Sequence, residues 1–85
     1  MQKYFMDWVV YILECADKTL YTGITNDFDK RLEAHMAGTG AKYTRNRAPF
    51  VCLYKESCKN RSEASKRELQ IKALSRDEKL ALIAQ

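Results

Sequence analysis

Five side chains in this sequence are of the types that phosphodiester hydrolysis requires. Tyr11 and Tyr21 lie near the start of the chain, and Arg31 follows in a segment with helical spacing. His35 comes one helical turn after Arg31, and Glu68 lies in a distant segment of the same kind. Together they supply a proton acceptor, a cation and a carboxylate for a divalent metal ion. The set indicates cleavage of a phosphodiester, provided that the fold gathers it.

Two of these charged side chains lie where apolar ones are expected. On a helical wheel, Glu68 falls within roughly 60° of Ala64 and Ile71, the residues expected to face a sheet. Burying a carboxylate without compensation costs several kcal/mol, so a cation or metal ion is expected beside it. Arg31 similarly lies at the edge of an apolar stripe, with His35 four positions later. We expect both helices to direct these groups into one site.

Each residue alone also has a purely structural interpretation. Tyrosines in neighbouring strands commonly pair across a sheet. Arg31 can cover apolar atoms with its stem, and His35 suits the last turn of a helix. Glu68 can form an ordinary ion pair with Lys72, four positions later, or with neighbouring Arg67. The catalytic interpretation therefore depends on all five residues together.

The strands that carry the tyrosines are predicted by apolar runs. Residues 8–15 are almost continuously apolar and rich in β-branched and aromatic types, which is typical of a central strand covered on both faces. Residues 19–25 form a second such run, so the two predict an antiparallel hairpin. Gly23 inside the second run indicates a bulge or a close approach of the backbone. Residues 50–54 predict a third strand.

The helices are predicted by their capping residues. Asn26 or Asp27 caps the first helix, and Gly38 ends it. Its apolar positions are Phe28, Leu32 and Met36. Residues 38–49 form a loop, and capping-box spacing begins at Asn60 and again at Ser75, which predicts two further helices.

This pattern predicts an α+β fold: a three-stranded antiparallel sheet flanked by helices, in the order β-β-α-β-α-α. We expect one domain over residues 1–85, with a core over about 8–82, because 85 residues approach the lower limit for a single core. No run approaches the ~20 apolar residues of a membrane span, and Asp7 interrupts the start. We therefore expect a soluble cytoplasmic protein without membrane association. The odd number of cysteines predicts reduced thiols, mostly buried in the core.

Basic side chains are concentrated in one part of the chain. The formal net charge is only +4, yet residues 42–76 hold ten Lys and Arg against three Glu. The ten are Lys42, Arg45, Arg47, Lys55, Lys59, Arg61, Lys66, Arg67, Lys72 and Arg76. Exposed helices often carry such charges merely as a solvated face. The loop cluster Lys42, Tyr43, Arg45 and Arg47 is more specific, because cations beside a stackable ring suit phosphates and an unpaired base.

Taken together, these residues resemble the GIY-YIG nuclease domain, in a small bacterial subfamily where that domain is nearly the whole protein. The resemblance runs from Trp8 to Leu82. Two triplets carry the family name, and here they read Val9-Val10-Tyr11 and Tyr21-Thr22-Gly23. The matching residues are Tyr11 of the first triplet, Tyr21 and Gly23 of the second, then Arg31, His35, and Glu68 ahead of Ile71-Lys72; Lys42-Tyr43-Thr44-Arg45 matches the subfamily's loop. Three triplet positions depart from the pattern, namely Val9, Val10 and Thr22. The asparagine that many members carry beyond the metal-binding helix is also missing, since no Asn follows Asn60.

The resemblance implies a single-metal endonuclease. Glu68 would hold Mg²⁺ or Mn²⁺, and Tyr11 would take a proton from the attacking water, aided by Tyr21 and His35. Arg31 would stabilise the phosphoryl oxygens and help to lower the pKa of Tyr11. The expected nucleic-acid contacts are Lys42, Tyr43, Arg45, Arg47 and Lys72.

The expected substrate is DNA more than RNA, at branched, damaged or single-stranded sites. A protein partner or a homodimer would supply specificity that so small a domain lacks. Two alternatives stay open: a nucleic-acid-binding module with little or no turnover, which the missing asparagine favours, and a protein-interaction adaptor without a nucleic-acid role.

Overall fold

The core of the molecule is a central strand with a partner on each side. In this computed structural model, which describes residues 8–85, strand β1 (Trp8–Glu14) lies between β2 (Leu20–Thr25) and β3 (Val51–Cys58). Both pairings are antiparallel. Helix α1 (Phe28–Met36) precedes β3, and α2 (Arg61–Lys72) and α3 (Arg76–Ile83) follow it. The predicted α+β fold and element order are confirmed.

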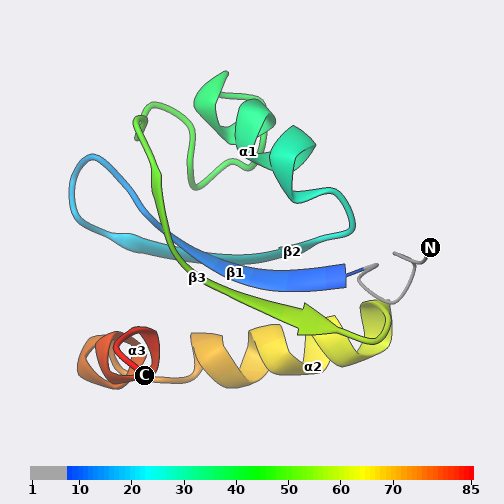
Figure 1. The fold of residues 1–85 in the computed structure, drawn as a ribbon. Helices are drawn as coiled ribbons and strands as arrows, with labels where there is room; N and C mark the ends of the chain where they lie inside the picture. The colour runs from blue at the N-terminus through cyan, green and yellow to red at the C-terminus, as the bar shows by residue number, and fades with distance from the viewer. Residues whose placement is uncertain (1–7) are drawn as a thin grey trace.

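Helices cover both faces of the sheet, as the apolar run of β1 predicts. Figure 1 shows α1 on one side of the sheet and α2 with α3 on the other. Tyr11 and Leu13 point to the α1 side and pack with Phe28 and Leu32. Val10 and Ile12 point to the other side, where Ile71 of α2 completes a second buried cluster. β1 is therefore buried on both faces, which explains its almost uninterrupted apolar sequence.

The first helix begins and ends close to its predicted bounds. Asp27, not Asn26, is the cap, and its carboxylate accepts a hydrogen bond from the backbone N–H of Lys30. Gly38 follows the last turn with φ +82°, a conformation that favours glycine. Met36 was predicted to lie on the apolar face, but its side chain is exposed. The helix ends there, beyond the area that packs on the sheet.

The second and third helices also begin at their predicted caps. The Asn60 side chain accepts from the backbone N–H of Glu63, and Ser75 forms both halves of a capping box with Glu78. The helical bounds thus follow from local sequence alone.

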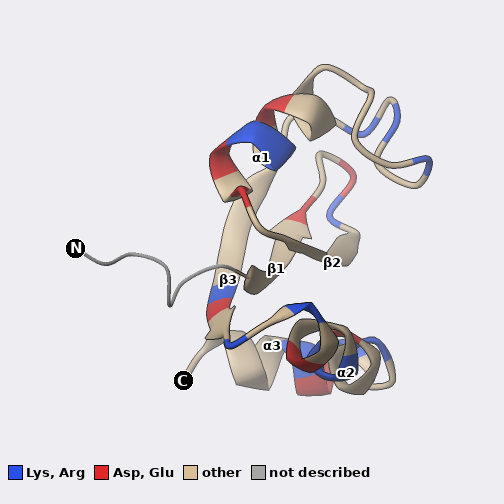
Figure 2. Cartoon of the chain, turned by 90° about the vertical axis from the view of Figure 1, so that its right-hand side faces the viewer, with Lys and Arg blue, Asp and Glu red and all other residues tan. Residues whose placement is uncertain are grey.

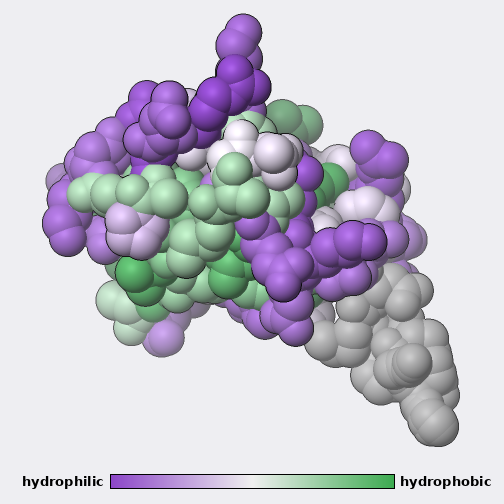
Figure 3. All heavy atoms as spheres, turned by 90° about the horizontal axis from the view of Figure 1, so that it is seen from above, coloured by the Kyte–Doolittle hydropathy of each residue, from purple (hydrophilic) through white to green (hydrophobic). Residues whose placement is uncertain are grey.

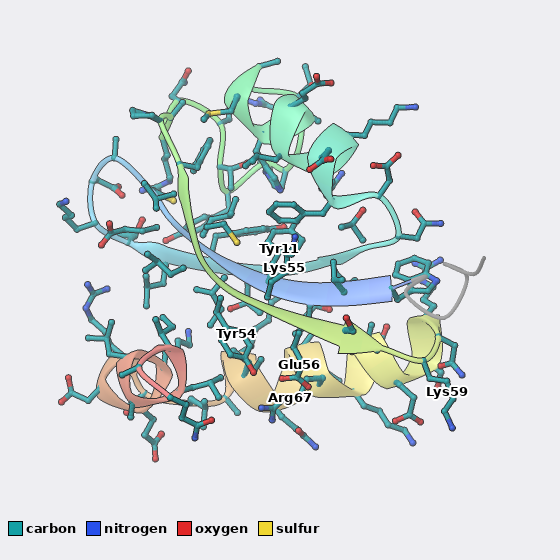
Figure 4. All side chains as sticks on the ribbon, in the orientation of Figure 1. Tyr11, Tyr54, Lys55, Glu56, Lys59 and Arg67 are labelled. Carbon is teal, nitrogen blue, oxygen red and sulfur yellow. The ribbon has the colours of Figure 1, made fainter. Side chains whose placement is uncertain are left out.

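β3 extends further than its apolar residues predict. The strand ends at Cys58 instead of at residue 54, because its register with β1 continues through Lys55 opposite Tyr11. Polar side chains are tolerated here because β3 lies at the edge of the sheet. Figure 4 shows Tyr54, Glu56 and Arg67 between β3 and α2, where Glu56 accepts hydrogen bonds from both the Tyr54 hydroxyl and the Arg67 guanidinium.

The three cysteines are free. Cys15 and Cys58 are buried, as predicted, whereas Cys52 is exposed, which corrects its expected role in core packing. Cys52 lies near the start of β3, which is an edge strand of the sheet formed by residues 8–85.

The surface on the α1 side is mixed in polarity. Figure 3 shows hydrophobic side chains gathered toward one side of this face and hydrophilic ones around them. The exposed large hydrophobic residues contributed by α1, the following loop and β3 are Met36, Tyr43 and Val51. Over residues 8–85, none of the helices is long and apolar enough to span a bilayer.

Candidate active site

Tyr11 lies at the centre of the candidate site and is fully buried. It projects from the middle of β1 toward α1, and its ring packs edge-on against Phe28 at 5.4 Å between centroids. Gly23 lies opposite it in β2, where a Cβ atom would come within 2.6 Å of the Tyr11 hydroxyl oxygen. Of the two predicted reasons for glycine here, a bulge or a close approach of the backbone, the close approach is the one observed. The irregularity in the sheet lies elsewhere, between β1 and β3 at Ile12 and Leu13.

His35 of α1 is bonded through both ring nitrogens. Its Nε2 is 2.9 Å from the Tyr11 hydroxyl, and its Nδ1 is 2.8 Å from Oγ1 of Thr44. Both His35 and Thr44 are buried. The Thr44 hydroxyl donates its proton to the carbonyl oxygen of Ala41 at 3.0 Å, so towards the imidazole Oγ1 acts as an acceptor.

These partners fix the tautomer of His35. Nδ1 carries the proton that Thr44 accepts, which leaves the lone pair of Nε2 free to accept the Tyr11 proton. Burial lowers the pKa of His35, and the nearby Arg31 guanidinium lowers that pKa further. The imidazole is therefore a neutral acceptor for the phenol, instead of an exposed polar group at a helix end.

Arg31 reaches the phenols from the same helix. Contact with the Tyr11 hydroxyl raises the pKa of Arg31, and Tyr21 acts in the same direction. Its Nε is buried without a hydrogen-bond partner within residues 8–85.

The electrostatics of Tyr11 differ from the sequence-based expectation. Burial raises the pKa of Tyr11 to about 12, although Arg31 acts to lower it. The expectation that neighbouring cations lower this pKa overall is wrong, because loss of solvent around the phenol outweighs the guanidinium. Tyr11 is thus a hydroxyl that donates to His35, not a preformed phenolate.

Tyr21 lies beside this cluster on the neighbouring strand. Its ring is 5.2 Å from the His35 ring and 6.3 Å from the Tyr11 ring. On its other side it stacks against Tyr43 at 5.9 Å, with planes only 24° apart. Tyr21 therefore connects the buried cluster to the loop over residues 38–49.

Glu68, the candidate metal ligand, lies on α2. Its neighbours on the wheel, Ala64 and Ile71, are completely buried, and its own side chain is only 20% exposed. The negative charge of Glu68 acts on Tyr11 and contributes to its raised pKa. The ion pair with Lys72 is present at 3.1 Å, whereas Arg67 pairs with Glu56 instead. Glu68 is thus both near the cluster and paired with a lysine.

The protein supplies few metal ligands here. Among residues 8–85, no group of three or more His, Cys, Asp or Glu side chains could hold a metal ion. The donor chemistry fits a divalent ion with one protein carboxylate, Glu68, whose other ligands are water and phosphate oxygens. The Lys72 ammonium lies on Oε2 of that carboxylate, so such an ion would compete with it.

The basic loop divides into two kinds of side chain. Lys42 and Arg45 are exposed, and Figure 2 shows Lys and Arg in this loop above the sheet and in α2 and α3 below it. Arg47 instead holds the loop in place. Its guanidinium pairs with Asp17 of the β1–β2 turn, its Nε donates to the Tyr43 carbonyl at 2.7 Å, and the same group lies over the Tyr43 ring. The loop cations are thus not equivalent.

Two residues that position the cluster had no role assigned from sequence. Thr44 orients His35, and Gly40 lets the loop pass over it, since a Cβ there would lie 2.5 Å from Nδ1 of His35. The only sequence signal for Thr44 is its place in Lys42-Tyr43-Thr44-Arg45. Gly40 carries no signal beyond that of a loop glycine.

The fold and this cluster together define the class of protein. The model of the GIY-YIG catalytic domain matches residues 7–81, and the chain belongs to this family of endonuclease domains. Members generally depend on divalent metal ions and bind nucleic acid.

Within the family, the chain is similar to small proteins named UPF0213. It is 52% identical over 77 residues to UPF0213 protein DP2720 of Desulfotalea psychrophila, covering 89% of this chain and 70% of that protein. It is 55% identical over 74 residues to UPF0213 protein OB0043 of Oceanobacillus iheyensis, covering 87% and 86% respectively.

A solution structure of a relative shares the fold. The NMR structure of UPF0213 protein BH0048 from Bacillus halodurans matches with a TM-score of 0.60 at 44% identity, over 91% of this chain and 82% of that one.

Proposed function

We propose that this protein is a divalent-metal-dependent endonuclease that hydrolyses phosphodiester bonds in DNA, at structured, damaged or single-stranded sites. The observation that carries the proposal is the convergence of a phenol, an imidazole, a guanidinium and a carboxylate. Tyr11 is hydrogen-bonded to His35 and interacts with Arg31, and the charge of Glu68 acts on the same phenol. The proposed catalytic residues are therefore those four together with neighbouring Tyr21.

The proton of the attacking water would pass along the Tyr11–His35 hydrogen bond. As the water oxygen attacks phosphorus, its proton moves to the Tyr11 oxygen while the phenolic proton moves to Nε2 of His35. The phosphorus–oxygen bond to the leaving group breaks, and that oxygen takes a proton from solvent. The imidazolium of His35 then returns its proton through Tyr11 to solvent, which restores the neutral phenol and imidazole. A free phenolate is never formed, which is consistent with a Tyr11 pKa of about 12.

Arg31 would neutralise charge on the phosphoryl oxygens during this step. The fixed fork of donors of its guanidinium suits that charge. Glu68 would hold the single Mg²⁺ or Mn²⁺, which when bound polarises the phosphate. Because one carboxylate is a weak site, we expect tight metal binding only when substrate oxygens complete the coordination.

Lys42, Arg45 and Lys72 would bind phosphates, with Tyr43 beside a base and Arg47 holding their loop. A partner or a second copy of the chain would supply specificity beyond these contacts.

A second candidate function is DNA binding with little or no turnover. It is favoured by the absence of an asparagine after Asn60 and by the Lys72 ammonium on the Glu68 carboxylate. This alternative predicts the same DNA affinity but no metal-dependent nicking. A pure protein-interaction role predicts no DNA binding even at low salt.

The test is nicking of plasmid and branched oligonucleotides with Mg²⁺ or Mn²⁺. Glu68→Ala should abolish cleavage. Glu63→Ala is the matched control, because Glu63 also lies on α2 and also pairs with a lysine, Lys66, on its own helix. Cleavage that survives Glu68→Ala, or that both substitutions reduce equally, would refute the proposal.

A further inference from the structure

A hollow of about 260 Å³ opens between the edge of the sheet and the two C-terminal helices. Its walls come from β2, the loop over residues 38–49, α2 and α3, and they are Leu20, Tyr21, Thr22, Tyr43, Lys72 and Lys79. One side is therefore apolar and aromatic, and the other carries two ammonium groups. Lys79 takes no part in the chemistry proposed for the active site.

This hollow adjoins the candidate active site through two shared groups. Tyr21 belongs to both, since its ring contacts His35 and also lines the hollow. Lys72 lines the hollow and lies 3.1 Å from the Glu68 carboxylate. A ligand bound here would be next to the phosphate that Arg31 would bind.

The aromatic wall is held in place by its own contacts. Tyr43 stacks on Tyr21 with one face, and the Arg47 guanidinium lies 4.5 Å from its ring centroid. Because Arg47 is also paired with Asp17, the ring is fixed instead of free to rotate. For a flat ligand beside these rings, edge-to-face contact is a favoured aromatic geometry.

The floor of the hollow contains an unpaired polar group. Thr22 is only 4% exposed, and its Oγ1 has no hydrogen-bond partner in the described part of the chain. Buried hydroxyls normally have a partner, and leaving one unpaired is unfavourable. Because this oxygen has less than 1 Å² of accessible surface, only a ligand whose entry shifts the surrounding side chains would supply that partner.

We propose that this hollow is a subsite for one unpaired nucleotide, next to the bond that is cut. The base lies against Tyr21, Tyr43 and Leu20 with its edge toward Thr22, and the adjoining phosphate lies between Lys72 and Lys79. This inference rests on the proposed function and refines it: the substrate has a single-stranded segment, such as a flap, a gap or a free strand.

Binding measured without metal tests the subsite separately from catalysis. In EDTA and low salt, fluorescence anisotropy would compare a short single-stranded DNA with its duplex. Lys79→Gln should weaken single-strand binding at least fivefold and duplex binding less than twofold. Lys66→Gln is the matched control, because Lys66 is an exposed lysine of α2 that lies outside this hollow.

The aromatic wall gives a second, independent variant. Tyr43→Leu should weaken single-strand binding, whereas Tyr43→Phe should retain it. Equal effects of Lys79→Gln and Lys66→Gln, or equal losses for single strand and duplex, would overturn the subsite. Single-strand preference without any cleavage by the unmodified protein would refute the nuclease proposal and leave the subsite intact.

Discussion

The hydroxyl of Tyr11 donates to Nε2 of His35 across 2.9 Å, between the centre of β1 and the last turn of α1. The direction of this bond is set by a third residue, since Thr44 accepts from Nδ1 and donates to the Ala41 carbonyl. A phenol of raised pKa and an imidazole of lowered pKa thus share one proton, with the proton on oxygen.

The first prediction concerns Thr44. Thr44→Val removes the acceptor for the Nδ1 proton, so the imidazole can place its proton on Nε2 and lose its capacity to accept from Tyr11. Cleavage should fall about tenfold or more, and Thr44→Ser should restore it. The chain has one histidine, so ¹⁵N NMR reports this tautomer without overlap. An unchanged tautomer in Thr44→Val would contradict the assigned role.

The second prediction concerns Gly23. An added Cβ would meet the Tyr11 hydroxyl oxygen at 2.6 Å and its ring carbon Cζ at 2.8 Å. Gly23→Ala should therefore lower the free energy of unfolding by about 1–3 kcal/mol, measured in urea, and should also reduce cleavage because the phenol is displaced. Gly38→Ala is the control: its cost of about 1 kcal/mol comes from a positive φ in open space, so cleavage should persist. Equal losses of cleavage would show that Tyr11 is not specifically affected.

Sequence alone could predict the elements that depend on local signals. The side chains of Asp27, Asn60 and Ser75 each accept a hydrogen bond from the backbone N–H three residues later, so the starts of the helices are predictable from sequence. The apolar run of β1 likewise predicted its central position. The end of β3 could not be predicted, because Lys55 is kept in the strand by its pairing with Tyr11 and not by its own preference.

For the site, residue types were predictable and their electrostatics were not. The wheel position of Glu68 correctly indicated a half-buried carboxylate. The pKa of Tyr11 depends on how completely Phe28, His35 and the loop exclude water from the phenol, which is a property of packing. The role of Thr44 depends on a hydrogen bond between residues nine positions apart in the chain, across a loop without regular structure.

The third prediction concerns stability at alkaline pH. The pKa of Tyr11 is about 12 in the folded protein and about 10 when unfolded, so between these values the unfolded chain releases a proton that the folded one keeps. Stability therefore falls as pH rises through this window. From about pH 9 to about pH 11, the contribution of Tyr11 should amount to about 1 kcal/mol in urea unfolding. Tyr11→Phe should show a correspondingly smaller decline, and parallel pH curves for the two proteins would contradict the raised pKa.

The fourth prediction separates the two kinds of loop cation. Asp17→Asn makes the protein more positive, so electrostatics alone predicts tighter DNA binding. The structure predicts weaker binding, because the substitution disrupts the Arg47 ion pair that holds Tyr43 on Tyr21. Arg45→Gln should instead reduce the slope of log affinity against log salt by about one, as for loss of a phosphate contact, without loosening the loop. Anisotropy titrations over a salt series measure the DNA affinity of both variants, and amide hydrogen exchange reports whether the loop has loosened. Tighter DNA binding by Asp17→Asn would refute the role of Arg47 in holding the loop.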